Sequence, residues 1–180
     1  QAYAISKISG VEMCRSYNIQ YGTNYKCLMP TNLYGPNDNY DLNESHFFAA
    51  AVRKIYEAKI KKKKSVKFWG TGNSMREAMF VDDLAEAILF FLDKNTKDYL
   101  INVGTGYEQK IKNYIKIISK IIDFKGKILF DQNKTLDGTP RKVVNISLAK
   151  KYGWKAMYNF EDGLKITLKD FIKNYKFYVK

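Results

Sequence analysis

The apolar residues at the start of the chain recur at helical spacing. Between Tyr3 and Tyr21 they stand mainly three or four positions apart, at Ile5, Ile8, Val11, Met13, Cys14 and Tyr17. A period near 3.6 residues places such residues on one face, so this stretch is predicted to be a helix. Short apolar runs bounded by turn residues follow it, and such runs predict strands.

Strands and helices are expected to alternate along the rest of the chain. We predict strands over residues 25–29, 66–69, 77–81, 99–103 and 127–130. We predict helices over residues 46–58, 82–92, 111–122, 147–152 and 160–175, with Ser45 and either Asp82 or Asp83 as the first two N-caps. Pro and Gly mark residues 30–36 as a turn-rich loop. The alternation favours an α/β fold with parallel strands.

The composition excludes a disordered chain and limits the kinds of partner that the protein can have. Hydrophobic residues make up 46% and aromatic residues 15% of the 180 positions, enough for a packed core. No apolar run reaches the length of a membrane span, so we predict no membrane partner. Cys14 and Cys27 have no disulfide framework or metal spacing, and we interpret them as reduced, structural residues of a cytoplasmic protein.

The net charge of +13 leaves three interpretations open. Nucleic-acid binding, attraction of an anionic small substrate, and a general lysine bias all produce such a charge. No zinc-finger pattern, recognition helix or Arg-aromatic strip accompanies it, so we predict no nucleic-acid partner. The run Lys59–Lys64 is interpreted as a solvated loop.

The first residues carry a Tyr-x-x-x-Lys pair, Tyr3 and Lys7. Residues four apart lie on one face of a helix, where an ammonium beside a phenol favours the phenolate. Such a phenol suits proton donation to a carbonyl during hydride delivery. Enzymes of this kind begin with a strand, a Gly-rich turn and a helix that hold a dinucleotide, and nothing precedes Gln1. We therefore predict that the chain is the C-terminal part of a longer enzyme.

Several further motifs occur in a consistent order along the chain. They are Met29-Pro-Thr-Asn-Leu-Tyr-Gly-Pro36, Asn43-Glu-Ser-His46, Trp69-Gly-Thr-Gly72, Met75-Arg-Glu77, Val81-Asp-Asp83, Ile101-Asn-Val-Gly-Thr-Gly106 and Asp137-Gly-Thr-Pro-Arg-Lys142. Together with Tyr3-x-x-x-Lys7 they resemble the GDP-L-fucose synthase family, extended short-chain dehydrogenases/reductases that act on nucleotide sugars. The resemblance covers nearly the whole chain.

The resemblance implies a fold, a cofactor and a substrate. It implies part of a doubly wound parallel, Rossmann-type sheet, formed by residues 1–36 and 77–104, that binds NADP(H). Residues 37–76 and 105–180 are expected to form a smaller α/β substrate domain. The implied activity is 3,5-epimerisation and 4-reduction of GDP-4-keto-6-deoxy-D-mannose to GDP-L-fucose. A homodimer formed through the first helix, with Met13 and Tyr17 on its outer face, is also implied for the full-length protein.

Roles carry over to matching positions. Tyr3 resembles the general acid at the C4 oxygen, and Lys7 the residue that holds the nicotinamide ribose and tunes Tyr3. His46 resembles the acid/base group of epimerisation, and it is also expected at the cofactor. The expected contacts are Pro30, Thr31, Asn32 and Leu33 with the nicotinamide end, and Lys54, Trp69, Arg76 and Asp137 with the GDP-sugar. A guanidinium fork suits a diphosphate, and no metal is expected.

Structural alternatives exist for several of these residues. His46 could simply begin a helix, Trp69 could fill a gap in the core, and Arg76 could form a surface ion pair. Asp82 and Asp83 fit a helix start better than catalysis. Gly104-Thr105-Gly106 follows a predicted strand without the complete phosphate-loop fingerprint, so it is interpreted as a turn.

Competing functions also remain open. The Gly-rich turn and the family's upstream Ser/Thr and Cys are absent from this sequence, so we expect the isolated chain to be inactive. One alternative is another nucleotide-sugar epimerase or dehydratase of the same superfamily. A second is a nucleotide-sugar-binding fragment without turnover.

Overall fold

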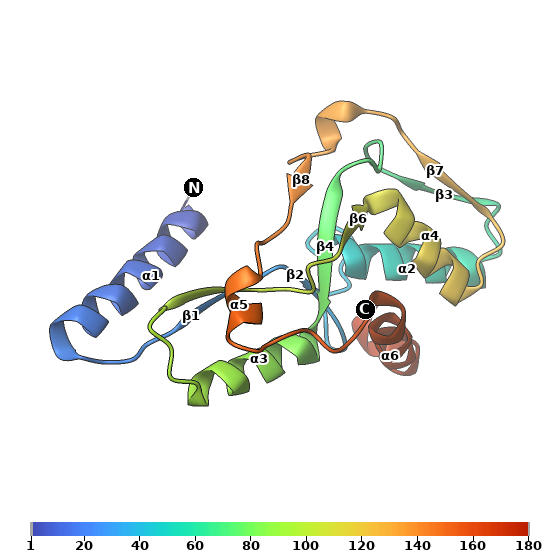
Figure 1. Ribbon diagram of the computed structural model, residues 1–180. Coiled ribbons are helices and arrows are strands. Elements are labelled where there is room, and N and C mark those ends of the chain that lie inside the picture. The colour runs from blue at the N-terminus through green and yellow to red at the C-terminus, as the bar shows by residue number, and fades with distance from the viewer. Residues whose placement is uncertain (1, 180) are drawn as a thin grey trace.

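The computed structural model describes residues 2–179, and it has an α/β arrangement (Figure 1). The helices are α1 (Ala2–Tyr21), α2 (Phe47–Ile60), α3 (Val81–Asp93), α4 (Ile111–Ile122), α5 (Ser147–Lys151), α6 (Phe160–Lys173) and α7 (Tyr175–Tyr178), with a 3₁₀ turn at Lys134–Leu136. The strands are β1 (Cys27–Pro30), β2 (Asn32–Tyr34), β3 (Ser65–Phe68), β4 (Met75–Phe80), β5 (Leu100–Val103), β6 (Glu108–Lys110), β7 (Lys127–Phe130) and β8 (Arg141–Lys142).

Most strand pairs are parallel, which confirms the predicted fold class. β1 pairs with β5, β2 with β4, and β3 with β7, all in parallel. β4 also pairs with β6 in antiparallel and with β8 in parallel orientation. β4 therefore links three other strands, and it runs through the middle of the molecule in Figure 1.

The apolar side chains gather in two clusters. The larger one joins α2, α4 and α6 to β3 and β7, with Ile55, Ile115 and Phe171 fully buried. The smaller one packs α3 and α5 around β5, through residues such as Phe91 and Ile101. Trp154 belongs to this second cluster, so the stretch after α5 packs with the strands of the first predicted domain.

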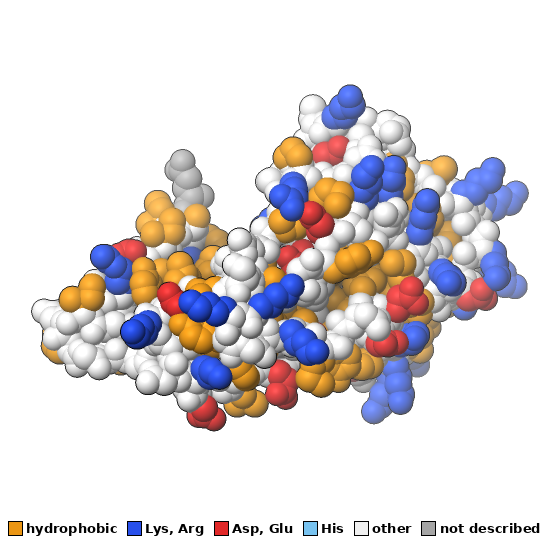
Figure 2. All heavy atoms as spheres, viewed as in Figure 1, with side chains coloured by type: hydrophobic (Ala, Val, Ile, Leu, Met, Phe, Trp, Pro, Cys, Tyr) orange, Lys and Arg blue, Asp and Glu red, His pale blue; other side chains and the backbone are white. Residues whose placement is uncertain are grey.

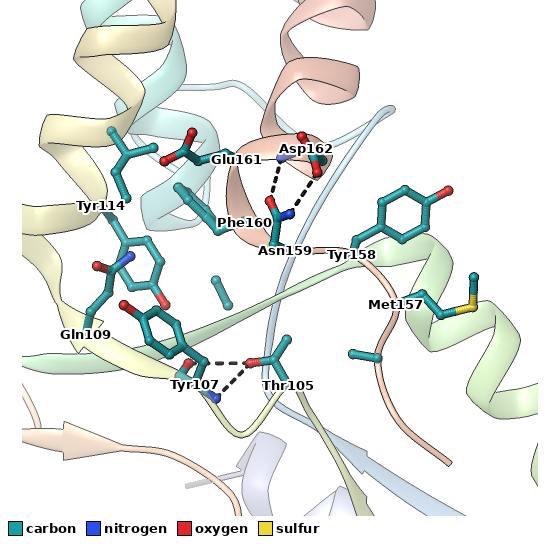
Figure 3. Close-up of a pocket in the computed structure, with 13 residues that line it drawn as sticks. Thr105, Tyr107, Gln109, Tyr114, Met157, Tyr158, Asn159, Phe160, Glu161 and Asp162 are labelled. Carbon is teal, nitrogen blue, oxygen red and sulfur yellow. Dashed lines mark hydrogen bonds between the residues drawn. The ribbon is translucent and has the colours of Figure 1, made fainter. Parts of the chain in front are cut away.

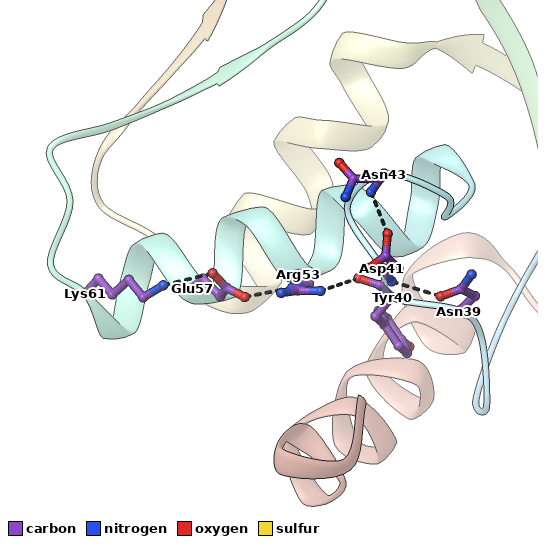
Figure 4. A network of polar contacts seen from close by, with 7 residues as sticks. All are labelled: Asn39, Tyr40, Asp41, Asn43, Arg53, Glu57 and Lys61. Atoms are coloured by element: carbon purple, nitrogen blue, oxygen red, sulfur yellow. Dashed lines mark hydrogen bonds and ion pairs between the residues drawn. The ribbon is translucent and has the colours of Figure 1, made fainter. Parts of the chain in front are cut away.

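A chain of polar contacts joins α2 to the loop before it (Figure 4). Arg53 donates to Glu57 at 2.7 Å and to the carbonyl of Tyr40 at 2.9 Å, and Lys61 donates to Glu57 at 3.0 Å. Burial alone raises the pKa of Glu57, but the hydrogen bonds and charges of Arg53 and Lys61 outweigh it and lower this pKa. The network anchors residues 39–43, which lead toward His46.

Two predicted N-caps are wrong. His46, not Ser45, is the N-cap residue of α2, and it makes no side-chain capping bond. Phe80 occupies that position in α3, while Asp82 and Asp83 lie in its first turn. The buried Asp83 carboxylate instead accepts hydrogen bonds from the backbone N–H groups of Met157 and Tyr158. It therefore ties α3 to the segment before α6 rather than closing its own helix.

The predicted loop over residues 30–36 contains a short strand. Thr31 donates its backbone N–H to Val103, and β2 then pairs with β4 from Asn32 onward. The chain thus passes from one sheet to the next within two residues. Glycine and proline mark turns in sequence, but pairing with the distant β4 decided the conformation here.

The N-terminal helix forms as predicted, yet it buries none of its side chains. Met13 is 60% exposed, and Figure 2 shows hydrophobic side chains along this part of the surface. Cys14 and Cys27 are half-buried free thiols; burial, together with a contact between them, raises the pKa of Cys27 to about 11. Among the residues that the structure describes, no helix is long and apolar enough to cross a membrane.

Candidate functional site

A cavity of about 660 Å³ lies where β1 passes into β2. It is bordered by the start of α1, the segment between β1 and α2, and parts of β4, α4 and β8. Its lining residues include Tyr3, Pro30, Thr31, Asn32, Leu33, Asp38, His46, Arg76 and Lys142. The C-terminal ends of parallel strands are the usual place for ligands in α/β proteins.

The cavity brings together seven of the predicted site residues from four separate elements. Tyr3 comes from α1, residues 30–33 from the β1–β2 connection, His46 from the start of α2, and Arg76 from β4. These positions are up to 73 residues apart (76 − 3) in the sequence. The folding of the chain thus assembles a mixed polar and aromatic site.

Tyr3 and Lys7 have the geometry expected from their spacing. The Lys7 ammonium lies 5.5 Å from the centre of the Tyr3 ring, and Tyr3 is 77% exposed. Lys7 itself does not line the cavity. The pair therefore presents a phenol at the rim with a cation beside it.

The β1–β2 connection is held in place by β4. The Asn32 side-chain amide donates to the Glu77 carbonyl at 2.8 Å, and the Thr31 hydroxyl donates to the same carbonyl at 3.3 Å. The Thr31 and Asn32 side chains are therefore engaged in hydrogen bonds to β4. Residues 30–33 line the cavity in this fixed position.

His46 is exposed at the cavity and has an acidic neighbour. Asp38 lines the same cavity, and burial raises its pKa while the nearby His46 acts in the opposite direction. Sequence patterns did not single out Asp38, because it lies in an irregular polar stretch without periodicity. Its only signal in the sequence was its position within the same loop, two residues after the Met29–Pro36 motif.

Arg76 and Lys142 place two cations side by side. They are direct partners in the parallel pairing of β4 with β8, and both line the cavity. Arg76 Nη1 donates to the carbonyls of Met75 and Thr139, which leaves Nε and Nη2 without a hydrogen bond among the described residues. Burial lowers the pKa of Arg76, and Asp137 partly opposes that effect. The surface ion-pair interpretation is wrong, because no carboxylate within residues 2–179 pairs with Arg76.

Lys142 was missed as a candidate, although it ends the quoted Asp137–Lys142 motif. The two-residue strand β8 is too short to be detected by periodicity. Only the pairing with β4 shows that the last lysine of the motif stands beside Arg76.

Three other predicted substrate contacts lie outside this cavity. Trp69 is 72% exposed, so it does not fill a gap in the core, and the Lys54 ammonium lies 5.0 Å from its ring centre. The Asp137 carboxylate accepts hydrogen bonds from the backbone N–H and the hydroxyl of Thr71, both at 2.6 Å. Those bonds lower the pKa of Asp137 and give it a role in holding the loop after β3.

A second cavity, of about 650 Å³, is lined in part by β6 and shares no lining residue with the first. Figure 3 shows Tyr107, Gln109 and Tyr114 on one side of it and Met157 on the other. No Lys, Arg or His lines this cavity, so it offers nothing to balance a diphosphate. The first cavity is therefore the better candidate site.

The comparisons with known proteins identify the class to which this site belongs. Residues 1–104 match the model of the NAD dependent epimerase/dehydratase family. This match covers more than half of the 180 residues, and the chain belongs to that family.

Within the family, the chain is similar to GDP-L-fucose synthases, as the motifs suggested. It is 41% identical to the probable GDP-L-fucose synthase 1 of Oryza sativa subsp. japonica, over 96% of this chain and 52% of the relative. It is 40% identical to the GDP-L-fucose synthase of Escherichia coli (strain K12), over 97% of this chain and 57% of the relative.

A solved structure agrees with this assignment. The GDP-L-fucose synthetase of Naegleria fowleri bound to NADP superposes with a TM-score of 0.87 at 25% identity, over 99% of this chain and 55% of that chain. The chain spans about half the length of the curated relatives that it matches.

Proposed function

We propose that this chain is the substrate-binding part of an NADPH-dependent enzyme that epimerises and reduces GDP-4-keto-6-deoxy-D-mannose to GDP-L-fucose. The supporting observation is the cavity that gathers Tyr3, residues 30–33, His46 and the pair Arg76 and Lys142. An acid, a second acid/base group and two cations at one site match the requirements of proton exchange and diphosphate binding.

The residues present fit the nicotinamide end of NADPH. Residues 30–33 line the same cavity as Tyr3, so they would border the nicotinamide ring. NADPH would supply a hydride when bound. Tyr3 would give a proton to the C4 oxygen, and Lys7 beside it would stabilise the resulting phenolate and hold the ribose.

His46 would exchange protons at C3 and C5 of the sugar. It is the N-cap residue of α2, follows the anchored residues 39–43 and lines the cavity. Arg76 and Lys142 would bind the diphosphate. Lys54 and Trp69 would extend binding beyond the cavity, with Trp69 offering a flat, exposed face. Asp137 would contribute to substrate binding indirectly, by holding the loop at Thr71.

The proposal also covers the domains of the protein, its oligomeric state and its location in the cell. Residues 1–36 and 77–104 would complete the NADP-binding domain, and residues 37–76 and 105–180 would form the substrate domain, with α5 packed against the former. The exposed apolar face of α1, including Met13 and Tyr17, supports a homodimer of the full-length protein. We assign the protein to the cytoplasm because its two cysteines are free. Sedimentation at micromolar concentration tests the dimer.

The activity is tested by separating proton exchange from hydride transfer. In the protein that carries this chain, His46→Ala should slow solvent deuterium incorporation at C3 and C5 by roughly 10²–10⁴-fold, the usual contribution of a general acid/base group. As a control measurement, the GDP affinity of His46→Ala should equal that of the unmodified protein. Exchange at the unmodified rate would return His46 to a purely structural role at the start of α2.

A further inference from the structure

Glu77 is a buried carboxylate for which the proposed chemistry has no use. It lies on β4 with only 1% of its surface exposed. Its carboxylate accepts hydrogen bonds from the Gly106 N–H at 2.8 Å, the Thr105 hydroxyl at 3.2 Å and the Val144 N–H at 3.3 Å. A buried carboxylate persists only where such donors satisfy it, so these bonds define its place.

The surrounding backbone is built closely around this carboxylate. A Cβ added at Gly104 would lie 2.4 Å from Glu77 Oε1 and 2.9 Å from a Val144 methyl carbon. Only a residue without a side chain leaves room for the carboxylate to reach both loops. Figure 3 shows Thr105 and Tyr107 on the loop whose Thr105 and Gly106 donate hydrogen bonds to Glu77.

The bond to Val144 connects Glu77 to the candidate site. Val144 lies two residues after Lys142, which pairs in register with Arg76. The segment after β8 is also held by Asn102, whose side chain donates to the Asn145 carbonyl at 3.2 Å. The two-residue strand β8 is held at its start by the Met75 N–H, which donates to the Pro140 carbonyl, and by the pairing of Arg141 with Glu108. The bonds to Val144 and Asn145 hold the segment that follows it.

We propose that Glu77 is a positioning residue that holds Lys142 beside Arg76 for binding of the diphosphate. This inference rests on the proposed function, since it assigns a ligand to the cation pair. The carboxylate acts through the Val144 N–H, which fixes the end of β8 and thereby the reach of the Lys142 ammonium. The backbone carbonyl of Glu77 holds Thr31 and Asn32 on the other side of the cavity, so one residue of β4 joins both halves of the site.

The test is a double-mutant cycle on GDP affinity, measured by calorimetry on the protein that carries this chain. Lys142→Ala should weaken GDP binding roughly tenfold, as expected for loss of one charge-assisted hydrogen bond. Glu77→Gln replaces one acceptor oxygen by a donor amide that faces N–H groups, and it should weaken GDP binding about fivefold through Lys142. In the Lys142→Ala background, Glu77→Gln should then change the affinity less than about twofold, because coupled residues are not additive.

Two control variants separate positioning from loss of stability. Asp83→Asn weakens the bonds that the Met157 and Tyr158 N–H groups donate to another buried carboxylate, one that does not line the cavity, and it should leave GDP affinity unchanged while lowering the melting temperature. Thr105→Val removes one bond to Glu77 but spares Val144, and it should also leave GDP affinity unchanged. If Glu77→Gln does not fold, Val144→Pro removes the same N–H donor and should reproduce the fivefold loss.

The outcomes distinguish this inference from the proposed function. If the unmodified protein does not bind GDP, the proposed function fails and the assignment of Glu77 fails with it. If the unmodified protein binds GDP, then full additivity of Glu77→Gln and Lys142→Ala, or an unchanged affinity in Glu77→Gln, overturns only the assignment of Glu77.

Discussion

Helices α1 and α2 follow similar sequence patterns and have opposite surroundings. Both repeat apolar residues at helical spacing, yet α1 buries none of its residues while α2 buries six, including Val52 and Ile55. α2 packs against α4 and the β3–β7 pair in the larger cluster. The difference teaches that apolar residues at helical spacing predict a helix but not the surface that covers it. We propose that α1 contributes chemistry through Tyr3, whereas the body of α2 packs in the larger cluster.

The largest effect should come from the exposed helix. Tyr3→Phe removes the proposed proton donor, and it should slow NADPH oxidation with the keto sugar by roughly 10²–10⁴-fold in the full-length enzyme. Because Tyr3 is 77% exposed, the free energy of unfolding should not change. Tyr21→Phe, at the other end of α1, is the matched control, and equal activities of the two variants would remove Tyr3 from the chemistry.

The next effect should come from the packed helix. Ile55→Ala leaves a cavity between α2 and its neighbours, and it should lower the free energy of unfolding by about 2–5 kcal/mol. Ile55 is fully buried, so its neighbours can close the gap only in part. Chemical denaturation measures the loss. A value below about 1 kcal/mol would show that the larger cluster is loosely packed and would weaken the comparison.

A smaller, pH-dependent effect should come from Asp137. Hydrogen bonds from Thr71 lower its pKa in the folded chain below the value of about 3.9 in an unfolded one. The resulting stabilisation is present above pH 4 and is lost as the pH falls through the folded pKa. Asp137→Asn should therefore lower stability at pH 7 and reduce the decline of stability below pH 4. Denaturation curves of Asp137→Asn and of the unmodified protein at pH 7 and below pH 4 check this prediction. The same pH dependence of stability in both proteins would contradict it.

The smallest effect should return to α1. Ile8 is 62% exposed, and Ile8→Ala should change the free energy of unfolding of this chain by less than about 0.5 kcal/mol. The loss of free energy of unfolding should therefore be several-fold smaller for Ile8→Ala than for Ile55→Ala, although the substitution is the same. A loss similar to that of Ile55→Ala would mean that α1 is covered in solution, for example by a second copy.

Much of the fold was predictable because local patterns carry it. The bounds of α4 and β7 agree with the predicted ranges, since α4 has apolar residues at helical spacing and ends at Asp123 in the left-handed conformation, and β7 is a short run rich in apolar residues. β2, β6 and β8 were not predicted, because strands of two or three residues exist only through pairing with β4. The N-caps failed for a related reason: Asp83 bonds to a segment more than 70 residues away instead of its own helix.

The sequence by itself determined the α/β class, the Tyr3–Lys7 pair and the motifs that resemble GDP-L-fucose synthases, because each depends on residues close together in the chain. Only the tertiary structure decided that Lys142 stands beside Arg76, that Asp38 neighbours His46, and that Trp69 is exposed. Likewise, only the fold showed that Glu77 holds both sides of the cavity. Hydrogen bonds and strand pairs between distant segments set these positions, and their free energy depends on the whole fold rather than on local spacing.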